Sequence, residues 1–286
     1  MNDWWLKVER AKKHMLDINK EAMRYTESHP YSFTHIRLPD SKQEIRGRFH
    51  ITKQPDPMIA IMLGDFIHNL RSALDWVVVA CSPKKLRYKA SFPIIFDDIF
   101  AKDRNGNFVV NNTHLRNSFN TAIAGLCPEA RTFIINLQPY RATELGLSPD
   151  IHNLGIVSRL ENADKHRQLI TVGCGGQDFT VSLTISGFTE PFKLRKTLAT
   201  GGKFLKDNTV IPYSFSPDGL FYPDGTPINP SEVDMHLSGT VKIFVQIASR
   251  KENQPPDIFP LENIMNTAVL DVTEILKWLE FFVVTK

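Results

Sequence analysis

The chain contains few cysteines, and none is placed for a disulfide framework or a zinc site. Its three cysteines, Cys81, Cys127 and Cys174, lie far apart within 286 residues and form no C-x-x-C pair. Disulfide-built secreted domains and structural zinc sites both need closely spaced cysteines. We therefore expect a cytoplasmic protein whose stability comes from a hydrophobic core.

Long hydrophobic runs and a strong charge imbalance are also missing. Apolar runs such as residues 76–80 and 58–63 are far too short to cross a bilayer. The N-terminal segment carries charges throughout, unlike a signal peptide. The net charge of +3 does not by itself predict a nucleic-acid binder. A basic run at residues 84–89 is either a solvated loop or a local contact to phosphates. We expect no membrane partner.

Motifs of well-characterised catalytic sites do not occur either. The chain has no G-x-S-x-G elbow of a serine hydrolase, no G-x-G-x-x-G or G-K-[ST] phosphate loop, and no Glu-x-x-His pair of a helical di-metal site. The sequence therefore excludes the common hydrolase and nucleotide-loop signatures, and we expect no cofactor.

Hydrophobic periodicity predicts an α+β protein that is mainly a helical bundle. Apolar residues at helical spacing predict helices over residues 3–26, 57–80, 113–125 and 128–137, a helix opened by Ser148, and a last helix over 261–282. Alternating and β-branched segments between residues 169 and 250 predict an antiparallel sheet. We expect a bundle over 1–168, the sheet region over 169–250, and a C-terminal helix within 251–286 that packs back on the bundle.

The most informative stretch is GDFIHNLRSALDWVVV, residues 64–79, within the predicted helix over 57–80. This helix is apolar on most sides, so we expect it to be buried. Four ionisable residues recur in it at spacings of three, three and four, which places them on one stripe: Asp65, His68, Arg71 and Asp75. Because an unpaired buried charge is very costly, the stripe predicts a paired polar network in the core.

A second polar cluster follows another apolar helix and consists of Asn162, Asp164, Lys165, His166 and Arg167. If the two helices pack together, the clusters form either a salt-bridge network that fixes helix register or a cleft for an anion. In the cleft, the cationic and imidazole groups that converge on a phosphodiester are His68, Arg71, Lys165 and His166. A metal ion held by His68, Asp75 and His166 is a third interpretation, and the missing Glu-x-x-His pair argues against it.

The first predicted helix carries a polar stripe of its own. Arg10, His14, Asp17 and Glu21 recur at helical spacing on a different side from the apolar residues. The stripe is either a solvated, salt-bridged face or part of a site, in which case Arg10 and His14 are candidate ligand-binding residues.

Three stretches resemble an uncharacterised family of bacterial and phage proteins. They are GDFIHNLRSALDW, LQPY at residues 137–140, and NADKHRQL at residues 162–169. The family shows GD-x-x-HNLRSALDH and N-x-DKHR motifs. The similarity extends in order from an N-terminal W-x-x-x-x-RA-x-x-H pattern to Leu169. It carries no settled activity.

More loosely, the helical part resembles the HEPN superfamily of helical ribonucleases and nucleotide-binding proteins. Their active motif is an arginine separated by four to six residues from a histidine, and RSALDH in the family fits this spacing. In this chain Arg71 keeps its place, but Trp76 stands where the histidine would be. Because an indole cannot titrate, the acid or base would have to come from His68, His166 or His14.

The resemblance implies a cytoplasmic bacterial protein that binds RNA or a nucleotide, with weak or absent metal-independent ribonuclease activity, and as a homodimer. Arg71 and Lys165 would hold phosphate, and His166 or His68 would act as acid or base. Asp75, Asn162 and Asp164 complete the expected ligand-binding set. The alternative is a non-enzymatic interaction protein, antitoxin-like or part of a phage defence, with a structural polar core. A site needs Arg71 and His166 open to solvent, whereas a structural network needs them sealed and paired.

Overall fold

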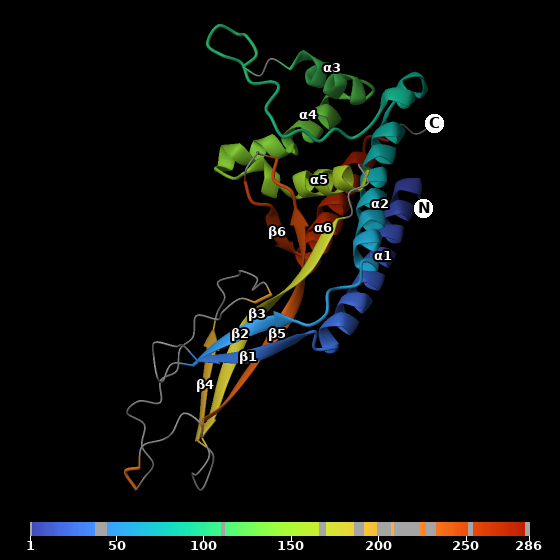
Figure 1. Cartoon of the computed structure of the whole chain (residues 1–286). Coiled ribbons are helices and arrows are strands. Elements are labelled where there is room, and N and C mark those ends of the chain that lie inside the picture. Colours follow the sequence, from blue (N-terminus) through green and yellow to red (C-terminus); the bar gives the residue numbers. More distant parts are fainter. Residues whose placement is uncertain are drawn as a thin grey trace. The chain divides into compact units, whose positions relative to one another are not determined.

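The computed structural model describes residues 2–37, 45–109, 112–165, 170–185, 192–198, 207–208, 224–226, 233–250 and 254–283. The α-helices are α1 (Asp3–Glu27), α2 (Met58–Cys81), α3 (Thr113–Ala122), α4 (Pro128–Asn136), α5 (Asn153–Lys165) and α6 (Leu261–Glu280). Short 3₁₀ helices are η1 (Lys84–Lys89), η2 (Pro139–Leu145) and η3 (Pro149–Ile151). The strands are β1 (Tyr31–Arg37), β2 (Ile45–Ile51), β3 (Thr171–Ile185), β4 (Phe192–Leu198), β5 (Val233–Ile247) and β6 (Asp257–Pro260). Figure 1 shows these elements along the chain.

The predicted fold class is confirmed. The described part of the chain is mainly helical, and an antiparallel sheet precedes the C-terminal helix α6. The chain divides into two compact units. Unit 1 comprises Met1–Lys20, Pro57–Thr171 and Val245–Lys286, and unit 2 comprises Glu21–Asp56 and Val172–Phe244.

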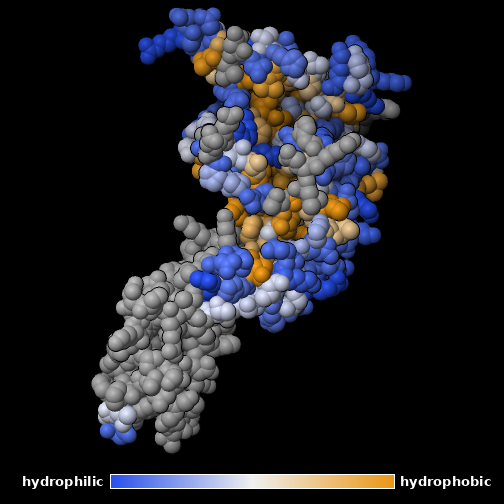
Figure 2. All heavy atoms as spheres, in the orientation of Figure 1, coloured by the Kyte–Doolittle hydropathy of each residue, from blue (hydrophilic) through white to orange (hydrophobic). Residues whose placement is uncertain are grey.

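Helix α2 is the centre of the core of unit 1. It packs against α5 and α6, and α5 also packs against α6. The side chains that α2 buries completely include Leu63, Phe66, Ile67, Leu70 and Leu74. Burying a large apolar side chain stabilises the fold by about 1.5–3 kcal/mol, so this helix supplies much of the driving force for unit 1. On the face drawn in Figure 2, apolar residues of this unit show between hydrophilic ones.

The ends of the helices follow from proline and capping residues. Pro57 occupies the N-cap of α2 in a helical conformation, and Ser82, which precedes a proline, is already extended. Ser148 caps as predicted, because its side chain accepts a hydrogen bond from the Asp150 N–H. However, the turn that it opens is the short 3₁₀ helix η3, and α5 begins only at Asn153.

Unit 2 is built from antiparallel strands and the last turns of α1. β1 pairs with β2 in the register Tyr31↔Ile51, and β3 pairs with β4 in the register Phe179↔Leu198. The larger sheet of this unit has the strand order β4-β3-β5. In this unit the Tyr25 hydroxyl donates to the Lys53 carbonyl and contacts the Cys174 sulfur, each at 2.7 Å.

Candidate functional site

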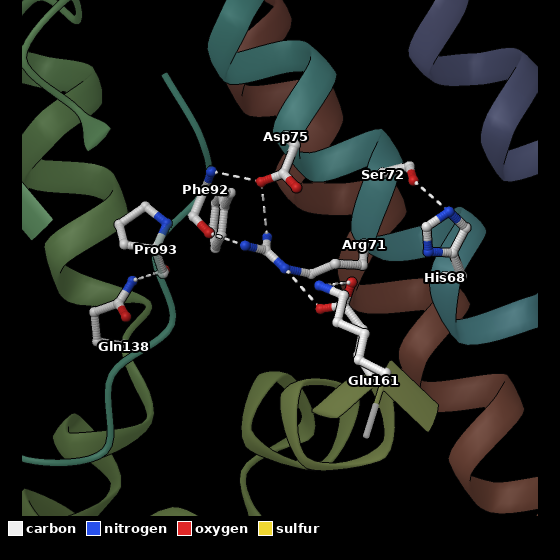
Figure 3. Close-up of polar contacts among 9 residues, drawn as sticks. His68, Arg71, Ser72, Asp75, Phe92, Pro93, Gln138 and Glu161 are labelled. Carbon is white, nitrogen blue, oxygen red and sulfur yellow. Dashed lines mark hydrogen bonds and ion pairs between the residues drawn. The ribbon is translucent and has the colours of Figure 1, made fainter. Parts of the chain in front are cut away.

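Arg71 lies at the centre of a polar cluster where α2 meets α5 (Figure 3). Its three guanidinium nitrogens each face a different protein oxygen. Nη2 donates to the Phe92 carbonyl at 2.5 Å, and Nε lies 3.2 Å from a Glu161 carboxylate oxygen. Nη1 lies 3.1 Å from Asp75 Oδ1 as an ion pair without hydrogen-bond geometry. Only 15% of the Arg71 side chain is exposed, so the cation is held among protein groups.

Asp75 lies one helical turn beyond Arg71 and connects α2 to the segment after η1. Its Oδ1 accepts a 2.8 Å hydrogen bond from the Phe92 N–H. Burial, the largest cause, raises the pKa of Asp75 above its ordinary value, although the Arg71 cation and the Phe92 N–H lower it. Asp75 therefore ionises less readily than a solvated carboxyl. Its carboxylate is held in position by the Phe92 N–H and by the Arg71 guanidinium.

Glu161 is the buried anion of the cluster, and the sequence interpretation did not single it out. Its side chain is 8% exposed and bridges Arg71 to Lys165, whose Nζ lies 2.8 Å from the other carboxylate oxygen. The signal that could have found it is spacing, because Leu154, Val157 and Glu161 fall on one buried face of α5. Two cations and two carboxylates thus balance in this cluster.

Gln138 is a second buried residue that sequence reasoning missed. It is fully buried. Its side-chain amide donates to the Pro93 and Ile134 carbonyls at 3.0 and 2.9 Å, and its oxygen accepts from the Ile95 N–H at 2.9 Å. The segment 92–95 has no regular structure, so side chains supply the partners that a sheet or helix would otherwise give its backbone. Arg71 and Asp75 hold its first residue, and Gln138 holds the next three-residue stretch (Figure 3).

His68 and Asp65 do not belong to this cluster, and the prediction that the whole stripe is buried is wrong for both. Each side chain is exposed. His68 points away from Arg71, and its Nε2 lies 3.5 Å from the Ser72 hydroxyl (Figure 3). The structure therefore separates the predicted acid or base from the predicted phosphate ligand.

The second predicted cluster is only partly described. Lys165 reaches the Arg71 cluster through Glu161, while 57% of its side chain stays exposed. Asn162 is exposed, and so is Asp164, whose carboxylate lies over Gly64 of α2. A Cβ at Gly64 would come within 2.7 Å of Asp164 Oδ1, which explains the glycine at this close approach. His166 and Arg167 lie outside the described residues.

The candidate residues of α1 lie apart from the Arg71 contacts. Arg10 is exposed and His14 is half-buried, and among the described residues neither makes an ion pair with a member of the Arg71 cluster. Trp76, at the position of the HEPN histidine, is 43% exposed, and the Lys7 ammonium lies 5.2 Å from its ring centroid. That indole takes part in a cation–π contact between α1 and α2.

The metal interpretation has no support in the described part of the chain. No three His, Cys, Asp or Glu side chains there are gathered closely enough to hold a metal ion. What the cluster offers chemically is a pair of carboxylates compensated by two cations, with most hydrogen-bonding groups already used by the protein.

The raised pKa of Asp75 gives a testable pH dependence. A folded-state pKa above the unfolded value means that the folded chain binds more protons between the two values, so stability is lost as pH rises through that window. Relative to Asp75→Asn, we expect the wild-type free energy of unfolding to fall as the pH rises above about 4, the ordinary pKa of an aspartate. Urea titrations at several pH values test this expectation. Asp65→Asn, the same substitution at an exposed position of α2, is the control for the change of side chain, and an Asp75→Asn slope equal to that of the wild type would contradict this expectation.

Among the described residues, no helix combines the length and apolar character needed to cross a lipid bilayer. A scan of protein-family models finds no match to this chain, and searches of curated proteins and of solved structures likewise find none.

Proposed function

We propose that this chain is a non-enzymatic interaction protein and that its Arg71 cluster is structural. The observation that carries the proposal is that each guanidinium nitrogen of Arg71 faces an oxygen of Asp75, Glu161 or Phe92. A phosphate could approach Arg71 only by displacing one of these oxygens. Displacing Glu161 would leave this buried carboxylate with only the exposed Lys165 as a partner, and weakening the pairing of a buried charge destabilises the fold.

The position of the imidazole supports the same proposal. A general acid or base has to lie within hydrogen-bond reach of the reacting group. The His68 side chain points away from the Arg71 guanidinium, and Trp76 stands where the HEPN motif has a histidine. A phosphate bound at Arg71 would therefore find no described imidazole beside it.

An interaction role agrees with the surface of unit 1. Large apolar side chains are more than half exposed at several places on it, among them Leu6, Tyr88, Leu270, Trp278 and Phe281. The Trp278 ring also stacks on Phe133, with centroids 5.1 Å apart. Apolar side chains that lie together at the surface, as the Trp278 and Phe133 rings do, are typical of surfaces that contact partners.

The competing proposal is a HEPN-like ribonuclease, favoured by the solvent-exposed imidazole of His68 on the same helix as Arg71. One assay separates the two proposals. Purified protein, Arg71→Lys and His68→Ala are incubated with single-stranded RNA, with and without EDTA. We expect no cleavage by any of them above a buffer control. Cleavage that falls at least tenfold in both folded variants would overturn the non-enzymatic proposal, and cleavage abolished by EDTA would overturn it in favour of a metal-dependent enzyme.

A further inference from the structure

The segment between α2 and α3 carries a dense group of positive charge. Within η1, four of six residues are basic, and the sequence KKLRYK contains no acidic residue. From residue 76 to residue 96 the chain contains no Asp or Glu at all. A patch of one charge sign, uninterrupted over such a length, attracts polyanions.

The two ends of η1 lie against the end of α3 and the loop that follows it. At the first end, Gly125 lies so close to Ser82 that a Cβ would come within 2.6 Å of the serine hydroxyl. At the other end, the Ser91 N–H donates to the Ala122 carbonyl at 3.3 Å. Arg87 holds the first turn by donating from Nε to the Ser82 carbonyl at 3.1 Å. The segment is thus held in place by its neighbours, while its three lysines and Tyr88 are exposed.

The three lysines of η1 are available to a ligand. Lys84, Lys85 and Lys89 are exposed, and none of the ion pairs within the described ranges involves them. Elsewhere in unit 1, by contrast, Lys12 and Lys277 pair with a glutamate three residues away. Unpaired ammonium groups can contact phosphates without first losing a protein partner.

Tyr88 adds an aromatic surface to this charge. Its side chain is 78% exposed, and the Lys89 ammonium lies 5.2 Å from its ring centroid. Side chains three residues apart eclipse one another in a 3₁₀ helix, which places Lys85 on the same side as Tyr88. An exposed ring beside cations is the arrangement on which successive bases of a single strand stack while the phosphates are neutralised.

Arg131 extends the basic surface on the supporting loop. Its guanidinium donates to the Leu126 and Ala124 carbonyls, so it is fixed to the same loop that anchors η1. The one acidic residue of the sequence between 113 and 131 is Glu129, in the first turn of α4. Within residues 76–96 and 113–131, basic side chains therefore outnumber acidic ones.

We propose that η1 is a binding surface for single-stranded nucleic acid, in which Lys84, Lys85 and Lys89 contact phosphates and Tyr88 stacks on a base. This inference rests on the proposed function, because it names the class of partner. An acidic polypeptide would use the lysines equally well but gives the exposed Tyr88 ring no stacking partner. The ring therefore favours the nucleic acid.

The test is binding of fluorescently labelled oligouridine RNA to the full chain, followed by anisotropy at several salt concentrations. We expect Tyr88→Ala to weaken binding roughly tenfold. The triple variant Lys84→Gln, Lys85→Gln, Lys89→Gln should lower the slope of log K against log salt by about 2. The control with the same change of charge, Lys12→Gln, Lys20→Gln, Lys277→Gln, should bind like the wild type. Circular dichroism confirms that each variant is folded.

Competitors decide the class of partner. Unlabelled oligouridine and oligothymidine should displace the probe, whereas a duplex of the same length and oligoglutamate should compete at least tenfold less well. No binding, or binding that the control triple weakens as much as the η1 triple, would overturn the inference. Oligoglutamate that competes equally, with Tyr88→Ala unchanged, would overturn it in favour of an acidic protein. Cleavage of the probe that Arg71→Lys abolishes would overturn the proposed function and leave the η1 surface standing.

Discussion

Arg71→Ala is expected to lower the free energy of unfolding by about 3 kcal/mol, because it removes the cation between two partly buried carboxylates. Glu161 would keep only the exposed Lys165, and Asp75 would keep only the Phe92 N–H. The Phe92 carbonyl would also lose its donor. Urea denaturation followed by far-ultraviolet circular dichroism measures the change.

The matched control is His68→Ala on the exposed side of the same helix. It removes a titratable side chain that makes only a 3.5 Å contact to Ser72, so we expect a change within about 0.5 kcal/mol. Arg71→Lys keeps the charge but not the three-way geometry, and should lie between the two at about 1–2 kcal/mol. If Arg71→Ala were as stable as His68→Ala, the cluster would not be structural.

The polar stripe on α2 could be predicted only in part, for a geometric reason. An α-helix completes a turn in 3.6 residues, so each step of three falls about 60° short of a full turn. Over the two steps from Asp65 through His68 to Arg71, the stripe therefore drifts around the helix. Asp65 therefore lies about 120° around the helix from Arg71 and reaches solvent, whereas Asp75, four residues beyond Arg71, stays close enough for an ion pair. His68 lies only about 60° from Arg71, and it is exposed because its side chain points away from the cluster. The spacing correctly predicted a paired polar contact between Arg71 and Asp75, and it wrongly included Asp65 and His68 in the buried network.

The partners of that pair were harder to predict than the helices themselves. The ends of α2 followed from Pro57 and from Ser82 before a proline, both visible in the sequence. Glu161 was not predicted as a buried residue because it directly precedes the polar residues 162–167 in the sequence, and a charged residue in that place is expected to be exposed. Gln138 lies in the LQPY stretch of the family resemblance, but that stretch does not indicate its role, because the role depends on an irregular segment brought close only by the tertiary fold.

Gln138→Leu is expected to lower the free energy of unfolding by about 3 kcal/mol, although the substitution is apolar and close in volume. Leucine would leave the Ile95 N–H and the Pro93 carbonyl without partners, and each unpaired buried backbone group costs about 1–3 kcal/mol. Gln254→Leu, at an exposed position of the same unit, is the control and should change stability by less than about 0.5 kcal/mol. Equal stabilities for the two variants would mean that water or a shifted backbone satisfies these groups.

The two clusters hold one segment, so their effects should not add. Arg71 and Asp75 bind Phe92, and Gln138 binds Pro93 and Ile95. Once either group of contacts is lost, the segment 92–95 can leave its site. Removing the other group of contacts then lowers the free energy of unfolding by less than it does in the wild type. The double variant Arg71→Ala, Gln138→Leu should therefore be destabilised by at least 1 kcal/mol less than the sum of the single variants. Strict additivity in urea titrations would show that the two clusters act independently, and that the segment is not their shared structural target.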